Sequence, residues 1–337
     1  MDIPEEELID PEAVSSEKVI SAIEDNIGKV IVGKKDVIRL ILAAALANSH
    51  VLLEDVPGTG KTMLARSLAA SINCTCKRVQ FTPDLLPMDI TGSMVYNPQN
   101  STFSFKKGPI FTNIFLADEI NRATPRTQSS LLEVMEEKQV SIDGGMYPMT
   151  RVFFVIATQN PIEQHGTYPL PEAQLDRFLF KLSLGYPDQQ SESEMLNRNI
   201  RESPISVLRP VVKMAEFAAV QSRIKKNSIV APEIMSYILA IVSSLREHPD
   251  LILGPSPRAS IALMRSGMAF ACISGRDFVI PDDIKFLAPY VLSHRMLLKP
   301  QSMIKKIRTD EIVKTVCGQI PVPIVKGNPS SSFIQAK

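Results

Sequence analysis

The sequence predicts an α/β fold in which helices cover both faces of a parallel sheet, followed by a second domain made only of helices. Short apolar strands alternate with helical stretches up to residue 185, and the later segments are helical. Such alternation is typical of a parallel sheet that is buried on both faces. The length of 337 residues fits two domains.

Five short apolar stretches are the expected strands of this sheet: residues 50–56, 76–81, 113–119, 151–159 and 177–184. Helices are expected at 37–47, from residue 62 onward, and at 124–138. Two further segments alternate around N-P-Q-N and D-G-G turns, which predicts inserted β-hairpins at about 93–110 and 139–152.

The chain divides into four segments on this basis: a flexible acidic lead (1–16), the α/β core (17–185), the helical domain (186–318) and a loose tail rich in Pro, Ser and Gly (319–337). In the helical domain, helices are expected at 195–203, 211–226, 232–248, 256–274 and 281–296.

Composition gives no general preference for nucleic acid or an anionic membrane, because the formal net charge is +1 and the pI is about 7.6. The first ten residues, MDIPEEELID, are acidic and lack an apolar region, so we expect no signal peptide. The sequence has no run of about 18 apolar residues, so we expect no membrane span and a cytoplasmic protein.

The stretch LLEDVPGTGKTMLA predicts a phosphate-binding loop between a strand and a helix. Gly58 and Gly60 let successive N–H groups face one concavity, and the following helix adds its positive end. Lys61 can reach the terminal phosphates, and Thr62 can offer its hydroxyl to Mg²⁺. The standard pattern requires glycine where this chain has Asp55. Aspartate tolerates tight turns, so we expect the loop to function; the alternative is a chance match.

A second candidate site is the acid pair at the end of IFLADE, Asp118 and Glu119. Buried strands rarely end in two carboxylates without a counter-charge, because desolvated anions are costly. One acid can join the Mg²⁺ shell while the other faces an attacking water, since neighbouring side chains at a strand end point in different directions. The alternative is an acidic surface loop.

Three polar residues complete the candidate site. Asn160, at the end of ATQN, could orient a water, although Asn-Pro is also ordinary turn chemistry. Arg177 lies where a short helix meets the last strand, and a salt bridge to Asp176 or Glu172 is its alternative role. Arg258 falls in a first helical turn, where the dipole disfavours a cation, so an anion such as a phosphate is expected nearby; the alternative is an unpaired exposed arginine.

Together these residues give the chain a resemblance to the AAA+ ATPases, specifically the MoxR family. The resemblance rests on LLEDVPGTGKT, LADEINRATPRTQSSLLEVMEE, FFVIATQNPIEQHGTYPLPEAQLDRFLFKL and GPSPRAS, and covers about residues 18–300. Aspartate at the position of Asp55 also occurs among MoxR-like proteins.

The resemblance implies a P-loop αβα core with a helical lid, which binds ATP and Mg²⁺ at their junction. It implies the following roles: Walker A and nucleotide binding for Pro57, Gly58, Thr59, Gly60, Lys61, Thr62 and Met63; Walker B for Asp118 and Glu119; sensor 1 for Asn160; the arginine finger for Arg177; sensor 2 for Arg258; and the adenine pocket for Val32 and Gly33. Thr62 and Asp118 would hold the metal. Two alternatives stay open: Arg122 or Arg126 could share the finger role, and Arg258 could act within or across subunits.

The resemblance also implies a ring of identical subunits, commonly a hexamer, that uses ATP hydrolysis to remodel or activate partner proteins, often ones with a von Willebrand factor A domain. A nucleic-acid motor is one alternative, because Phe103, Phe105, Lys106 and Lys107 make an aromatic and basic strip on the first hairpin. The near-zero net charge makes a nucleic-acid motor a weaker prediction than a motor that remodels proteins. A chelatase-type motor subunit would share the same motifs, and a non-hydrolysing scaffold would not need them.

Overall fold

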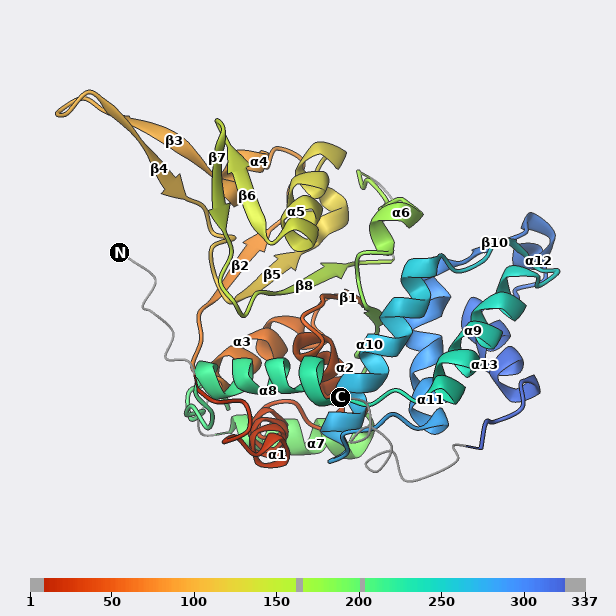
Figure 1. The fold of residues 1–337 in the computed structure, drawn as a ribbon. Helices are drawn as coiled ribbons and strands as arrows, with labels where there is room; N and C mark the ends of the chain where they lie inside the picture. The colour runs from red at the N-terminus through yellow and green to blue at the C-terminus, as the bar shows by residue number, and fades with distance from the viewer. Residues whose placement is uncertain (1–8, 162–165, 201–203, 325–337) are drawn as a thin grey trace, which may run out of the picture.

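A parallel sheet of five strands forms the centre of the core, as the sequence predicts (Figure 1). The computed structural model describes residues 9–161, 166–200 and 204–324. The strands lie in the order β2 (Cys76–Gln80), β5 (Ile114–Asp118), β8 (Phe154–Gln159), β1 (Val51–Glu54) and β9 (Phe180–Leu182). All four neighbouring pairs are parallel, so the carboxyl ends of the strands meet at one edge of the sheet.

Helices cover both faces of this sheet because its strands alternate buried side chains between two apolar clusters. Ile114 and Leu116 of β5 join the cluster that contains α1 (Ser16–Gly28), α2 (Lys35–Leu46) and α3 (Lys61–Ser71). Phe115 and Ala117 join the cluster on the opposite face, with α4 (Pro87–Thr91) and α5 (Pro125–Glu137). The result is a three-layer core.

Two antiparallel hairpins extend from the core inside the segments where the sequence predicts them (Figure 1). The first pairs β3 (Gly92–Asn97) with β4 (Thr102–Lys107), and the second pairs β6 (Gln139–Ile142) with β7 (Gly145–Pro148). Phe105 stacks on Tyr147 with ring centroids 4.0 Å apart, which joins the hairpins. Phe103, nearer the tip, remains 66% exposed.

The second domain is helical, with α8 (Met214–Asn227), α9 (Pro232–Arg246), α10 (Pro257–Ile273), α11 (Pro281–Leu292), α12 (Pro300–Ile304) and α13 (Thr309–Gln319) after the connecting helix α7 (Gln189–Asn199). The sequence prediction of helices alone missed one feature: β10 (Leu251–Leu253) and β11 (Leu297–Leu298) form a small antiparallel pair. It joins two loops that lie far apart in the sequence. Residues 1–8 of the expected lead, 201–203, and 325–337 of the expected tail lie outside the described residues.

A buried arginine ties the helical domain to the core. Arg295, in the 3-10 turn η2 (Ser293–Arg295), donates to Asp176 Oδ1 at 2.6 Å and to the carbonyl oxygen of Phe178 at 2.6 Å. It is 6% exposed. The apolar cluster around α2 continues into α10, so the two domains also share buried side chains. In the described part of the chain, no helix is both long and apolar enough to cross a bilayer.

Candidate nucleotide site

The predicted phosphate loop links β1 to α3. Gly58 and Gly60 have φ of +86° and +91°, the left-handed region that glycine adopts without strain. Gly60 caps α3, so the free N–H groups of the first turn open toward the loop. A Cβ built at Gly58 would meet nothing within 4 Å, which leaves room beside the backbone. Lys61 Nζ donates to the carbonyl oxygens of Asp55 at 2.8 Å and Val56 at 3.2 Å.

Asp55 does not lie at the mouth of the loop, which explains why it can replace the usual glycine. Its carboxylate accepts hydrogen bonds from the Ser183 hydroxyl (2.7 Å) and from the backbone N–H groups of Leu184 (2.6 Å) and Gly185 (3.0 Å). The residue is 5% exposed. Asp55 therefore joins the start of the phosphate loop to the segment that leaves the core for the lid.

The predicted metal-binding acid, Asp118, ends β5 beside the loop and is engaged on both oxygens. Thr158 of β8 donates its hydroxyl to Oδ1 at 2.6 Å, and Arg78 of β2 donates to Oδ2 at 2.7 Å and 2.9 Å. Arg78 thus supplies the counter-charge that a carboxylate at a strand end requires. A cation bound at Oδ2 would have to displace this guanidinium.

Glu119, the second acid, has the strained backbone that functional residues often show. Its φ is +55°, rare for a residue with a side chain. The Thr158 hydroxyl accepts its backbone N–H at 2.9 Å, which holds this conformation. The Glu119 carboxylate accepts from Gln80 Nε2 at 2.6 Å and pairs with Arg122 Nε at 3.0 Å.

Asn160 lies at the loop edge of the sheet, and the segment that contains Val32 begins beside the loop. Asn160 follows β8 at the same edge of the sheet and is buried. Ile31 lies beside the loop, because a Cβ at Gly60 would meet Ile31 Cδ1 at 3.9 Å. Gly33 has φ of +72°, and a Cβ there would lie 2.2 Å from Ser191 Oγ. The positive φ favours glycine, and a larger residue would require the Ser191 side chain of α7 to move.

Arg177 and Arg258 lie at the opposite edge of the sheet. Arg177 precedes β9, just after α6 (Glu172–Leu175), and pairs with Glu136 in the last turn of α5 at 3.0 Å. Arg258, in the first turn of α10, pairs with the other oxygen of Glu136, also at 3.0 Å. The alternative prediction, a salt bridge from Arg177 to Asp176 or Glu172, is therefore wrong. An unpaired Arg258 is also wrong.

Arg177 and Arg258 are far from the phosphate loop of their own chain, because they lie at the opposite edge of the sheet. A six-residue strand such as β8 spans about 20 Å. The phosphate loop, Asp118, Glu119 and Asn160 follow strands, whereas Arg177 precedes one. Arg122 lies at the same edge as the phosphate loop, because it pairs with Glu119. Arg126 is exposed at the start of α5.

The first group of residues fits a nucleoside triphosphate with Mg²⁺. The glycine turn, the start of α3 and Lys61 provide donors and positive charge for phosphate oxygens. Thr62 and Asp118 provide the oxygen ligands that Mg²⁺ prefers. Within the described residues, no group of three or more His, Cys, Asp or Glu side chains could hold a metal alone.

Three side chains that contact the two predicted acids escaped the sequence prediction: Arg78, Gln80 and Thr158. Arg78 and Gln80 share one face of β2, two residues apart, and β2 lies beside β5. In the sequence, these two polar residues interrupt a segment that otherwise fits a strand of the sheet, and this was the signal that could have identified them. Thr158 is fully buried in an apolar strand, where a hydroxyl needs a partner.

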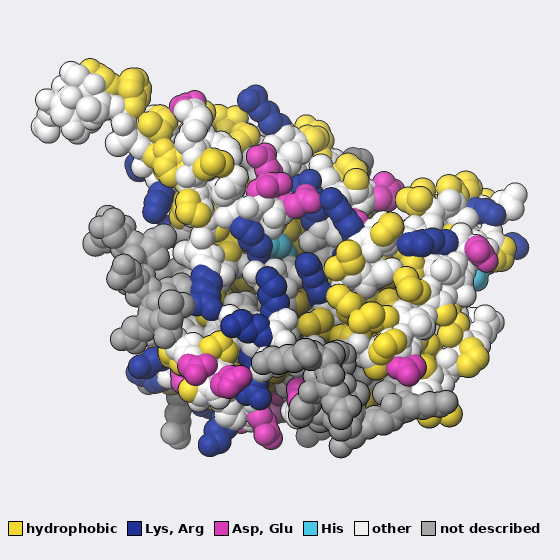
Figure 2. Space-filling model, viewed as in Figure 1, with side chains coloured by type: hydrophobic (Ala, Val, Ile, Leu, Met, Phe, Trp, Pro, Cys, Tyr) yellow, Lys and Arg dark blue, Asp and Glu magenta, His cyan; other side chains and the backbone are white. Residues whose placement is uncertain are grey.

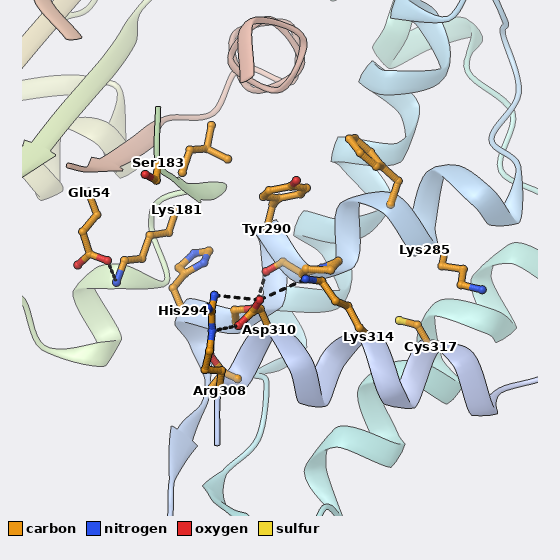
Figure 3. A pocket seen from close by; sticks show the side chains of 15 residues that line it. Glu54, Lys181, Ser183, Lys285, Tyr290, His294, Arg308, Asp310, Lys314 and Cys317 are labelled. Atoms are coloured by element: carbon orange, nitrogen blue, oxygen red, sulfur yellow. Dashed lines mark hydrogen bonds and ion pairs between the residues drawn. The ribbon is translucent and has the colours of Figure 1, made fainter. Parts of the chain in front are cut away.

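A separate cavity of about 530 Å³ lies between β1, β9 and the lid helices α11 and α13 (Figure 3). On its core side, Lys181 pairs with Glu54 at 2.7 Å. On its lid side, Asp310 accepts from Arg308 and Lys314. Its described lining includes none of the loop residues 57–63. Its charges mostly pair with one another.

Comparison with known proteins agrees with this geometry. The family model "ATPase family associated with various cellular activities (AAA)" matches residues 50–180, and the "AAA lid domain" model matches residues 243–316. The uncharacterized protein YeaC of Bacillus subtilis is 51% identical over 300 residues, covering 89% of this chain and 93% of the relative. Chaperone MoxR1 of Mycobacterium tuberculosis is 38% identical over 310 residues, covering 89% and 81%.

Among solved structures, a crystal structure from Cytophaga hutchinsonii, titled as that of a candidate ATPase, superposes with a TM-score of 0.85. It is 39% identical in sequence, and the match covers 92% of this chain and 96% of the other. The core, the lid and the sequence relatives lead to one assignment. The chain belongs to the MoxR family of AAA+ ATPases.

Proposed function

We propose that the chain hydrolyses ATP with Mg²⁺ at a site that a second copy completes, and that the cycle remodels or activates partner proteins. The observation that carries the proposal is the division of the predicted site between two edges of the sheet. The loop and both acids lie at one edge, and Arg177 and Arg258 lie together at the other. In a head-to-tail ring, one edge of each copy faces the opposite edge of the next.

The residues of the loop edge would act on the phosphates and on water. Lys61 turns from the carbonyl oxygens of Asp55 and Val56 to the terminal phosphates. Glu119 polarises the attacking water, and Asn160 orients it. Thr62 and Asp118 would hold Mg²⁺, which would neutralise phosphate charge when bound.

Gln80 and Arg122 both contact Oε2 of Glu119, which holds the carboxylate in place in the free chain. Arg177 of the next copy would stabilise the transition state, a contribution worth about 10³–10⁵ in rate. A single subunit is therefore expected to be nearly inactive.

The assembly is proposed to be a ring, a hexamer as the resemblance implies, that works in the cytoplasm on a client protein. The relative named Chaperone MoxR1 supports a chaperone-like role. A partner with a von Willebrand factor A domain is one candidate client. The exposed Phe103 and Tyr96 near the tip of the first hairpin offer an apolar contact for a client.

The test is ATP turnover measured against protein concentration, with Glu119→Gln and Arg177→Ala beside the wild type. Specific activity should rise with concentration and fall in both variants. Full activity of Arg177→Ala would contradict its assignment. Addition of DNA tests the alternative of a nucleic-acid motor, which predicts stimulation that salt removes.

A further inference from the structure

The cavity between β1, β9 and the lid helices α11 and α13 (Figure 3) has the size of a small-molecule site. Its volume of about 530 Å³ lies within the range of about 300–1,000 Å³ that ligand pockets occupy. It shares no lining residue with a second cavity, which Arg177 and Arg258 line. Figure 2 shows the basic side chains that gather near that second cavity, where the core meets the lid. The first cavity is therefore a separate candidate site.

The cavity carries more positive than negative charge. Four cationic side chains line it: Lys181, Lys285, Arg308 and Lys314. Two carboxylates oppose them, Glu54 on the core wall and Asp310 on the lid wall, so the formal net charge of the lining is +2. His294 adds no charge, because burial lowers its pKa well below its ordinary value. The lining as a whole therefore favours an anion.

Each carboxylate holds only cations of its own wall (Figure 3). On the core wall, Lys181 Nζ pairs with Glu54 at 2.7 Å. On the lid wall, Asp310 accepts from Arg308 at 2.9 Å and from Lys314 at 3.3 Å. The lid-wall cations are 68% and 64% exposed, so a ligand can reach them, and exposed pairs of this kind are worth little. Within the described residues, no ion pair joins the two walls across the cavity.

An aromatic surface also lines the cavity. Phe286 and Tyr290 of α11 are half-buried, and their ring centroids lie 5.6 Å apart. Pro289, from the same helix, adds apolar atoms beside them. A flat apolar body can pack on such a surface while its charged groups face the cations.

We propose that this cavity is a second ligand site, which binds a small organic dicarboxylate with a flat apolar body and places one carboxylate on each wall. Cations lie on both walls, with Lys181 on the core side and Arg308 and Lys314 on the lid side. A ligand with a charge at each end can meet both groups, whereas a single charged group meets one of them. This binding is a property of the single chain and does not rest on ATP hydrolysis.

The experiment titrates naphthalene-2,6-dicarboxylate into the full chain and follows binding by probe fluorescence and by calorimetry. The probe has one carboxylate at each end of a flat apolar body, and saturable binding with a Kd below about 1 mM is expected. 2-Naphthoate, which has a single carboxylate, should bind at least about threefold more weakly. Equal affinity for the two compounds would overturn a site with two charged walls.

Variants of the lining charges locate the probe. Lys181→Ala combined with Lys314→Ala removes one cation from each wall and should weaken binding about tenfold. Asp310→Asn should tighten binding about threefold, because a competing charge is removed. Lys299→Ala combined with Lys305→Ala is the matched control, since both lysines are exposed on the lid outside this lining. The control should leave the affinity unchanged.

Three results would overturn the proposal. One is the absence of saturable binding up to about 10 mM probe. Another is unchanged affinity in Lys181→Ala with Lys314→Ala, because the probe would then bind elsewhere on the chain. The third is unchanged or weaker binding in Asp310→Asn, which keeps the proposal falsifiable if the double variant fails to fold. Each result is read from binding alone, so it is distinct from a failure of the proposed function.

Discussion

Asp55 occupies the position where most phosphate loops have glycine, and its carboxylate points into the protein. It receives one hydroxyl and two backbone N–H groups from residues 183–185. A buried carboxylate with three donors is a strong local restraint, because each lost bond would leave a buried group without a partner. The residue thus links the loop to the path that the chain takes into the lid.

Asp55→Gly restores the standard pattern and is nevertheless expected to destabilise the protein. Three buried hydrogen bonds are lost, which predicts a decrease of about 2–5 kcal/mol in the free energy of unfolding. Urea denaturation measures this change. Asp36→Gly, at an exposed position in the first turn of α2, is a control for glycine itself. Equal or higher stability of Asp55→Gly would show that the three bonds do not matter.

Arg78 competes for the carboxylate that is proposed to hold Mg²⁺. Because its guanidinium donates twice to Asp118 Oδ2, Arg78→Ala should lower the divalent-ion concentration needed for half-maximal nucleotide binding, by about threefold. A fluorescent ATP analogue titrated with Mn²⁺ reports this value. Lys77→Ala, on the neighbouring residue of the same strand, should leave it unchanged. A higher requirement in Arg78→Ala would mean that Arg78 assists the metal.

The sequence predicts the residues of the nucleotide site better than it predicts their partners. Gly58, Gly60 and Lys61 follow from a local pattern, because one loop places them. The contacts of Thr158 and Gln80 depend on which strands are neighbours and in what register, which no local pattern specifies. Glu136 is harder still, since it meets Arg258 only after the lid has docked.

At the scale of elements, the position of the lid depends on a buried ion pair. Arg295 of η2 bonds to Asp176 and to the carbonyl oxygens of Phe178 and Leu179 just before β9. Arg177 lies between Asp176 and Phe178, so the same contact fixes the backbone of the proposed finger. The sheet and most helices follow from apolar periodicity, whereas the β10–β11 pair does not, because its strands are only three and two residues long.

Arg295→Ala should destabilise the protein by about 3–5 kcal/mol, because it removes a buried cation and leaves the half-buried Asp176 and the carbonyl oxygens of Phe178 and Leu179 without their donor. The midpoint of urea unfolding gives the measurement. Arg308→Ala is the matched control: Arg308 pairs with Asp310 but is 68% exposed, so its loss should cost less than about 1 kcal/mol. Similar losses in the two variants would contradict a special role for the buried pair.

The whole molecule should lose stability as the pH falls below 6.5, in part through His50. Burial lowers its pKa from 6.5 to about 3, and its Nδ1 accepts the backbone N–H of Val155 at 3.0 Å. The unfolded chain takes up a proton that the folded chain refuses, so the contribution is present above pH 6.5 and is lost as the pH falls toward 3.

His50→Gln removes this titration, so its free energy of unfolding should fall less steeply between pH 6 and 5, by about 1 kcal/mol per pH unit. Urea unfolding at several pH values gives the slope. His248→Gln, at a partly exposed position just after the lid helix α9, should keep the wild-type slope. An unchanged slope in His50→Gln would show that the buried imidazole does not withhold the proton.

The arrangement of the whole molecule places the loop and the paired arginines at opposite edges of one sheet. Neither edge carries the complete set of groups proposed for hydrolysis. The central claim is that two copies share each site, and mixing two inactive variants tests it most directly. Lys61→Ala lacks the phosphate lysine, and Arg177→Ala lacks the finger.

Each variant alone should be nearly inactive, and an equal mixture should recover ATP turnover. Random assembly in a head-to-tail ring pairs an intact loop with an intact finger at about a quarter of the interfaces, so recovery near that fraction of wild-type activity is expected. A mixture that stays as inactive as the separate variants, while both still assemble, would contradict a site shared between copies.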